Sequence, residues 1–179
     1  MTSGEVTWRL AVHPTDQPAL STFNCARPAP PKAPSNGWKK IYPQPAEAYA
    51  QRSVRELRTA KDNRGKRGIW IGEDDKGIAA VLAWEWQDKP HVHLNVAAIA
   101  SRCRGEPTRQ LSTDMIDTVL QQLAGQADAD GFDHLIVTAY IHQDNAASEA
   151  FAERQGMGCL DKRDSRDGGY RLWSLEISW

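Results

Sequence analysis

Residues 91–109 read HVHLNVAAIASRCRGEPTR, and an amphipathic run continues from there to Ala124. The first ten residues alternate as a β-strand does. Its apolar positions are Val92, Leu94 and Val96. Its polar positions, expected on the opposite face, are His91, His93 and Asn95. A basic loop follows, and then apolar residues four apart predict the buried stripe of a helix from about 108 to 124. This stripe consists of Leu111, Met115, Val119 and Leu123.

Periodicity and turn residues predict the elements on either side of this stretch. We expect strands at about 5–12, 68–73, 77–87 and 134–141, and a closing hairpin from 159–162 and 170–177. Helices are expected at about 16–23, where Thr15 or Asp16 caps the start, at 46–60, and after Asp144 or Asn145. This order predicts an α/β fold with a mixed sheet. No change in composition divides the chain, so we expect one domain over residues 1–179.

A proline-rich segment occupies about residues 27–45 and contains Trp38 and Tyr42. Prolines exclude regular structure there, and the aromatic side chains suggest that the segment packs on another part of the molecule. The segment is either an ordered irregular loop or a flexible one, and its aromatic residues either pack on the protein or border a site.

The 179 residues are 40% hydrophobic and 25% charged, which is typical of a soluble globular protein. No apolar run approaches the roughly 20 residues that cross a bilayer. The first residues, MTSGEVTWRLAV, do not resemble a secretory signal. Cys25, Cys103 and Cys159 form no CxxC pair, which favours reduced thiols in a cytoplasmic protein.

The net charge of −1 is spread unevenly along the chain. Residues 27–67 contain eleven Lys or Arg against three acidic residues, an excess of +8, so the rest carries −9. The basic segment is either a solvated helix face or a surface for an anionic group. The nearly neutral total argues against nucleic acid as a partner.

Arg102, Arg104 and Gly105 stand immediately before the predicted helix at 108. The first N–H groups of a helix are unpaired and attract phosphate oxygens, and arginines add charge-assisted hydrogen bonds. By itself this pattern also fits ordinary surface arginines near a helix start.

A second motif, NAASEAFAERQGM at residues 145–157, follows the apolar strand at 134–141. Asn-x-x-Ser-x-x-Phe followed by Gly-Met resembles the second signature of the GNAT N-acetyltransferase superfamily. The strand, Arg104-Gly105 and helix resemble the pyrophosphate loop of the same family. The two motifs come in the family's order, about 40 residues apart.

The resemblance implies a GNAT-like α/β fold: a mixed, mostly antiparallel central sheet of about seven strands with helices on both faces. It also implies an acyl-CoA-dependent N-acyltransferase that passes acetyl from acetyl-CoA, its co-substrate, directly to a primary amine. The cofactor would lie where strands 91–100 and 134–141 separate. The cofactor-binding residues implied are Ala98, Ile99, Ala100, Arg104, Gly105, Thr108, Arg109, Gln110, Asn145, Ser148 and Phe151.

The resemblance places His93 where some family members carry a catalytic glutamate. A histidine, with an ordinary pKa of about 6.5, suits the acceptance of an ammonium proton near neutral pH. The alternative for His93 is a histidine satisfied by its neighbours in the sheet. His91 could share the role through water, and Glu85 is the carboxylate alternative. Tyr140 or Cys159 could protonate the leaving thiolate, and His142 is either near the site or a loop residue.

Three positions depart from the family pattern. Pro107 and Arg109 stand where glycine or alanine is usual, and Ala152 replaces a tyrosine that many members use as an acid. These departures keep two alternatives to an acetyltransferase open. The first is a non-catalytic GNAT-like module that binds acyl-CoA or a related ligand as a sensor. The second is a transferase of the same fold that uses a longer acyl-CoA.

Other site types lack their sequence patterns. His91-x-His93 has no third metal ligand at a diagnostic spacing, so no metal is expected. No GxSxG elbow supports a serine hydrolase.

The expected acceptor is a small-molecule or peptide amine, with no membrane partner. Trp173 and Trp179 are candidates for a homodimer contact.

Overall fold

A computed structural model of the protein describes residues 5–26, 44–59, 65–160 and 169–179. Trp38 and Tyr42, predicted to border a site, lie outside these ranges. The strands are β1 Thr7–Leu10, β2 Arg67–Asp74, β3 Gly77–Asp88, β4 His91–Ile99, β5 His134–His142, β6 Gly158–Cys159 and β7 Tyr170–Ser178. The helices are α1 Gln17–Ser21, α2 Gln44–Glu56, α3 Glu106–Ala129 and α4 Ala146–Arg154, with a 3-10 turn at Ser101–Cys103.

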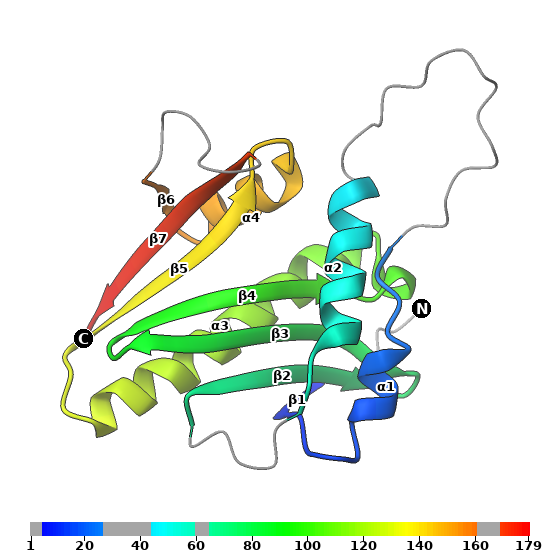
Figure 1. Ribbon diagram of the computed structural model, residues 1–179, viewed down its shortest axis with the longest axis horizontal. Helices are drawn as coiled ribbons and strands as arrows, with labels where there is room; N and C mark the ends of the chain where they lie inside the picture. Colours follow the sequence, from blue (N-terminus) through cyan, green and yellow to red (C-terminus); the bar gives the residue numbers. More distant parts are fainter. Residues whose placement is uncertain (1–4, 27–43, 60–64, 161–168) are drawn as a thin grey trace.

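The seven strands form one sheet in the order β1-β2-β3-β4-β5-β7-β6. Every neighbouring pair is antiparallel except β4 and β5, which run parallel. Helices α1 and α2 cover one face, and α3 and α4 lie behind the other (Figure 1). The predicted mixed, mostly antiparallel sheet with helices on both faces is confirmed.

Two apolar clusters fill the space between the sheet and its helices. The predicted stripe on α3 is buried, and it packs on Val92 and Leu135 of the sheet. On the opposite face, Leu20 of α1 and Val54 of α2 pack on Ile71 and other sheet residues. The sheet is thus enclosed on both faces, and the two clusters hold α2 and α3 at fixed positions across it.

Strand β4 changes the face that it buries, and the expectation that Val92, Leu94 and Val96 share one face was wrong. In the register with β3, Leu94 lies opposite Trp84 and Val96 lies opposite Ala83, so Asn95 is an extra residue. Leu94 accordingly packs in the cluster beneath α3, whereas Val96 packs in the cluster beneath α2. Such a β-bulge reverses the alternation of side chains and increases the local twist. Val96 therefore shares the α2 face with His91 and His93, instead of the face of Val92 and Leu94.

Three smaller expectations also need correction. Asp16 stands at the N-cap position of α1, but its carboxylate accepts hydrogen bonds from Arg9 and the Val12 N–H instead of capping the helix. Helix α3 extends beyond the predicted range at both ends, from Glu106 to Ala129. Trp173 is only 4% exposed, so it is not available for a dimer contact, whereas Trp179 is 49% exposed. No helix among the described residues has the length and apolarity to span a membrane.

Gly68 and Gly125 allow a matched test of the packing. A Cβ atom at Gly68 would lie 2.7 Å from the ring of the buried Trp84, whereas at Gly125 in α3 it would meet nothing within 4 Å. We expect Gly68→Ala to lower the free energy of unfolding by about 1–3 kcal/mol, because the core cannot admit the added volume. Gly125→Ala should raise it by about 0.5–1 kcal/mol through helix propensity. Urea denaturation measures both, and an unchanged stability for Gly68→Ala would contradict the packing described.

Candidate active site

The parallel strands β4 and β5 separate part-way along their length. They pair from His91 opposite Ile136 to Leu94 opposite Ala139, and the pairing ends there. The bulge at Asn95 begins at this point. Beyond it, a cleft opens between the two strands and continues toward the start of α3. The predicted separation of these strands is therefore present.

The outer part of the cleft has a volume of about 650 Å³ and lies against the start of α3. Most of the predicted cofactor residues line it: Ala98, Ile99, Arg104, Gly105, Thr108, Arg109, Asn145, Ser148 and Phe151. Ala100 and Gln110 are not among the described lining residues. The Ala100 N–H donates to Ala79, and the exposed Gln110 donates to Asp114.

The backbone of β4 offers hydrogen-bonding groups to this cleft. The Ala100 N–H donates to the Ala79 carbonyl at 2.8 Å, and Ile99 lies opposite Ala80 in the ladder with β3. In an antiparallel ladder the polar groups of successive residues point to opposite sides. Those of Ile99 and Ala97 therefore point away from β3, toward the open side between β4 and β5. An extended ligand can pair with this strand edge.

Helix α3 begins beside the cleft with Gly105 as its N-cap. Gly105 has φ of 123°, a conformation that side chains rarely adopt, so glycine is required at this turn. Pro107 is the second helical residue after this cap and brings no N–H group. Thr108 donates its hydroxyl to the Cys103 carbonyl, which fixes the turn. The helix start thus offers positive potential with one donor fewer than usual.

Two arginines near this turn have different partners. Arg102 makes two hydrogen bonds to Asp74, at 2.6 and 2.8 Å, and one to the Gly77 carbonyl. It therefore binds the turn between β2 and β3 and does not line the cleft, contrary to the expectation of a phosphate ligand. Arg104 does line the cleft, but its guanidinium also pairs with Glu47 of α2 at 2.5 Å and donates to the Cys25 carbonyl.

Helix α4 forms the far wall of the cleft. Its N-cap is Asn145, whose side-chain oxygen accepts a hydrogen bond from the Ser148 N–H at 3.3 Å. The cap uses only this oxygen, so the amide nitrogen can donate to a ligand. Asn145, Ser148 and Phe151 line both parts of the cleft. The second sequence motif therefore builds a wall that is continuous from the outer part to the inner part.

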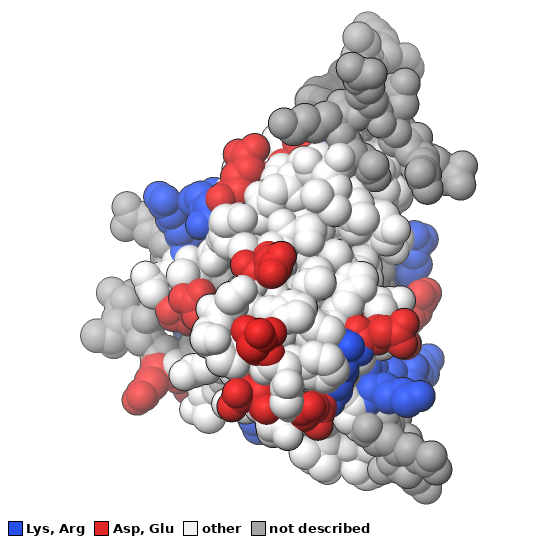
Figure 2. All heavy atoms as spheres, turned by 90° about the vertical axis from the view of Figure 1, so that its left-hand side faces the viewer, with Lys and Arg blue, Asp and Glu red and all other residues white. Residues whose placement is uncertain are grey.

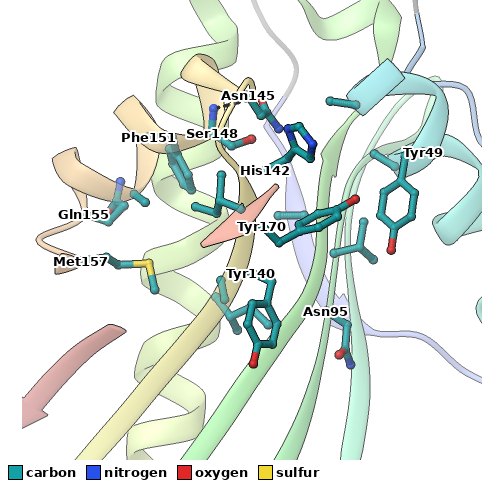
Figure 3. A pocket seen from close by; sticks show the side chains of 18 of the residues that line it. Tyr49, Asn95, Tyr140, His142, Asn145, Ser148, Phe151, Gln155, Met157 and Tyr170 are labelled. Carbon is teal, nitrogen blue, oxygen red and sulfur yellow. Dashed lines mark hydrogen bonds between the residues drawn. The ribbon is translucent and has the colours of Figure 1, made fainter. Parts of the chain in front are cut away.

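The inner part of the cleft, of about 170 Å³, passes between the separated strands (Figure 3). Tyr49 of α2 and Tyr170 of β7 approach each other over it, with ring centroids 6.5 Å apart. The edge of the His142 ring packs against Tyr170, and His142 Nδ1 accepts from the Asp144 N–H. Among the described lining residues of this part there is no Asp, Glu, Lys or Arg.

The three predicted catalytic residues come together on the α2 face of β3, β4 and β5. Glu85 is exposed and lies opposite His93 in the ladder of β3 and β4. The Tyr140 ring lies 5.2 Å from the His93 ring, centroid to centroid. Tyr140 is 61% exposed and lines the inner part of the cleft, as does Asn95 (Figure 3). Cys159, the alternative acid, lies on β6, and it is not among the described lining residues.

His93 is half-buried, and this burial lowers its pKa below the ordinary value, with a further lowering from His91 and an opposing effect from Glu85. A lowered pKa keeps the imidazole in the neutral form that can accept a proton. His93 Nδ1 lies 3.0 Å from Thr138 Oγ1, and His91 Nε2 lies 2.9 Å from the same oxygen. The two histidines therefore share a threonine hydroxyl, where the sequence suggested water.

Several site residues were missed at the level of sequence. Thr138 stands within an apolar strand, and Glu47 and Tyr49 lie on a helix with no distinguishing motif. Only Tyr170 had a positional signal, as the first residue after a Gly-Gly turn. These residues come from separate elements, so no local spacing could have grouped them. Within the described part of the chain, no three His, Cys, Asp or Glu side chains are placed to hold a metal.

Comparison with known proteins gives matches through structure alone. No family model matches the sequence, and no curated protein matches it significantly. The fold is similar to that of the ribosomal-protein-S18-alanine N-acetyltransferase from Escherichia coli, with a TM-score of 0.60 and 14% identity over 98% of this chain and 96% of that one. A GNAT-family acetyltransferase from Staphylococcus aureus gives a TM-score of 0.58 and 8% identity, over 96% and 99%.

A structure described as a bacterial toxin gives a TM-score of 0.68 and 12% identity, covering 98% of this chain and 92% of that chain. Identities this low carry information about the fold only. The sheet order, the separation of β4 from β5, and the matched structures agree with each other and with the two sequence motifs. The chain therefore has the fold of the GNAT N-acetyltransferases.

Proposed function

We propose that this protein is an acyl-CoA-dependent N-acyltransferase that transfers acetyl from acetyl-CoA directly to a primary amine. The observation that carries the proposal is the continuous cleft, which runs from the start of α3 through the opening between β4 and β5. It joins a helix N-terminus, suited to phosphate, to an inner part lined by Tyr140, whose ring packs on the half-buried His93. A long phosphorylated thioester and an amine can thus occupy the outer and the inner part of the cleft and meet where the two parts join.

The outer part of the cleft would hold the cofactor. The start of α3 and the guanidinium of Arg109 would bind its pyrophosphate, and Arg104 would contribute once it exchanges Glu47 for phosphate oxygens. The strand edge at Ala97 and Ile99 would pair with the amide groups of its arm. The Asn145 amide would donate to the same arm from α4. Acetyl-CoA would supply the activated acyl group.

The inner part of the cleft would hold the amine. The amine nitrogen attacks the thioester carbonyl carbon, the carbon–sulfur bond breaks, and the nitrogen loses a proton. His93 takes that proton, and Glu85, directly opposite, is the alternative base. Tyr140, which is 61% exposed and lines the inner part, would protonate the departing thiolate. The chemistry relies on positioning, with no covalent enzyme intermediate.

The lining suggests an acceptor whose amine enters in the neutral form or loses its proton on entry. The described inner lining has no charged group to pair with an ammonium ion, and low polarity favours the neutral amine. A small molecule or the end of a peptide fits a cleft that narrows between Tyr49 and Tyr170.

A second candidate is a non-catalytic module of the same fold that binds acyl-CoA as a sensor. Ala152 favours it, because this residue is 2% exposed in a cluster with Ile141 and Trp173 and has no hydroxyl to protonate a thiolate. Pro107 also favours weaker phosphate binding, since it removes one N–H at the start of α3.

Acetyl-CoA binding and turnover distinguish these two candidates. We expect acetyl-CoA at 100 times its dissociation constant to stabilise the fold by about 2.7 kcal/mol through mass action, raising the melting temperature. A thiol-release assay over a panel of amines should then detect free CoA. Stabilisation without release on any amine would favour the sensor. No stabilisation at millimolar acetyl-CoA would contradict both.

Alanine substitutions of Arg109 and Arg102 form a matched pair that tests where the cofactor phosphates bind. Arg109→Ala should weaken acetyl-CoA binding roughly three- to tenfold, because a charge-assisted hydrogen bond to phosphate is lost. Arg102→Ala removes the same charge but breaks only the contacts with Asp74 and the Gly77 carbonyl, so affinity should stay within twofold. Isothermal titration at two salt concentrations measures both, and the Arg109 effect should shrink at high salt. Equal losses in the two variants would contradict the placement of the phosphate.

His93 as the base has a defined pH dependence. Its pKa is lowered, so the free base persists to lower pH, and kcat/KM should fall only as the pH drops below about 6.5. His93→Gln should reduce kcat roughly 100-fold and remove this limb, with little change in acetyl-CoA affinity. His134→Gln, the same change at the far end of β5, is the control and should leave the profile intact. Retention of the limb in His93→Gln, with its loss in Glu85→Gln, would assign the base to Glu85.

A further inference from the structure

Thr138 on β5 is the centre of a hydrogen-bond network on the acceptor face. It lies opposite His93 in the parallel ladder and is only 5% exposed. Its Oγ1 lies 2.9 Å from His91 Nε2, 3.0 Å from His93 Nδ1 and 3.3 Å from the Val92 carbonyl oxygen. Three partners thus surround one buried hydroxyl.

The single proton of the hydroxyl restricts how these contacts can be made. If Thr138 donates to His91 Nε2 or to the Val92 carbonyl, His93 must donate its own Nδ1–H to the threonine oxygen. Only donation to His93 Nδ1 itself would allow the other tautomer. Two of the three arrangements therefore put a proton on His93 Nδ1, which makes Nε2 the basic nitrogen.

We propose that Thr138 is a positioning residue that holds His93 with its proton on Nδ1 and connects it to His91, so that a proton received at His93 Nε2 is released at His91. This inference rests on the proposed acyl transfer, for which it supplies the proton exit. In this arrangement two histidines and one hydroxyl carry the proton together, whereas a simple base would act through one histidine alone.

The proton balance closes without any further reactant. The amine proton binds His93 Nε2, and the Nδ1 proton passes to Thr138 Oγ1. The hydroxyl proton of Thr138 passes to His91 Nε2, and the Nδ1 proton of His91 leaves to water. One proton enters and one leaves, and no bond other than N–H and O–H is changed. Exchange of the ring protons with solvent restores the starting tautomers.

Acidic side chains surround the His91 end of the network. Asp88 lies opposite His91 on β3, and Glu176 of β7 lies opposite Ile136, the β5 neighbour of His91. Figure 2 shows acidic side chains gathered on the left-hand face of Figure 1, where the turn between β3 and β4 lies. This end of the network therefore lies in a region of negative potential.

The His93 end has a more balanced set of charges. Glu85 lies opposite it on β3 and raises its pKa, whereas burial and His91 lower it. Arg67 of β2 lies opposite Glu85, and Arg58, which follows α2, lines the same pocket as Glu85. From β5, the Tyr140 ring packs on His93. Burial therefore disfavours protonated His93.

Nitrogen NMR tests the network without any turnover. Two-bond proton–nitrogen spectra of the full chain with labelled histidine report the tautomer of each of the five histidines, assigned with His91→Gln and His93→Gln. We expect His93 to carry its proton on Nδ1 at neutral pH in the wild type and in Thr138→Ser, and to lose this preference in Thr138→Val. A proton on Nε2 in the wild type, or identical His93 spectra in Thr138→Val, would overturn the proposal.

Kinetics then separate positioning from packing. Thr138→Val should lower kcat about tenfold and alter the pH–rate profile, with KM for the amine and the acetyl-CoA melting shift unchanged. Thr138→Ser, which keeps the hydroxyl, should recover most of the rate. If the serine variant is as impaired as the valine variant, or if valine leaves the profile unchanged, the proposal is wrong.

Two further outcomes are also decisive. If Thr138→Val does not fold, His91→Phe removes the other end of the network, and unchanged His93 spectra in that variant would overturn the coupling. If the wild type acetylates no amine, the proposed function fails, whereas the histidine spectra still decide whether Thr138 connects the two rings.

Discussion

The end of hydrogen bonding between β4 and β5 is the constraint on which the rest of the site depends. The two strands pair over four residue positions and then part where β4 carries the extra residue Asn95. A continuous ladder would fill this space with backbone hydrogen bonds and close the sheet. The bulge instead leaves one edge of β4 open, and it sends Leu94 and Val96 to opposite faces. The open edge, the cleft and the polar face beside it all follow from this local change.

The cleft is held open by packing on both faces of the sheet. The apolar stripe of α3 anchors one wall beneath the sheet, and α2 covers the other face above Val81 and Val96. Arg104 connects these two layers, because it lies at the start of α3 and pairs with Glu47 of α2 and the Cys25 carbonyl. A ligand that attracts Arg104 would therefore act on the position of α2 as well as on the cofactor loop.

On the acceptor face, the described residues that line the inner part of the cleft are uncharged, and charged residues lie beside it. Tyr49, Tyr140 and Tyr170 supply apolar surface with hydroxyl groups, and the described inner lining carries no formal charge. His142 lies within this lining, whereas Glu85, His91 and His93 are not among its described residues and lie on the neighbouring strands β3 and β4. This separation suits a reaction in which a neutral amine must form inside and its proton must leave. It also accounts for the lowered pKa of His93, since burial opposes its charged form.

The sequence by itself determined the order of elements, the mixed sheet, and the two motifs at Arg104-Gly105 and Asn145–Phe151, because periodicity, capping and turn residues act over short distances. It also placed His93, Glu85 and Tyr140 on adjacent strands. The alternation of polar and apolar residues could not reveal that Leu94 and Val96 lie on opposite faces of the sheet. A prediction from alternation assumes a strand without an extra residue such as Asn95. Nor could it show that Arg102 binds Asp74 while Arg104 faces the cleft, or that Thr138 joins two histidines. Only the tertiary structure decided these points, since each depends on which strands lie side by side and in what register.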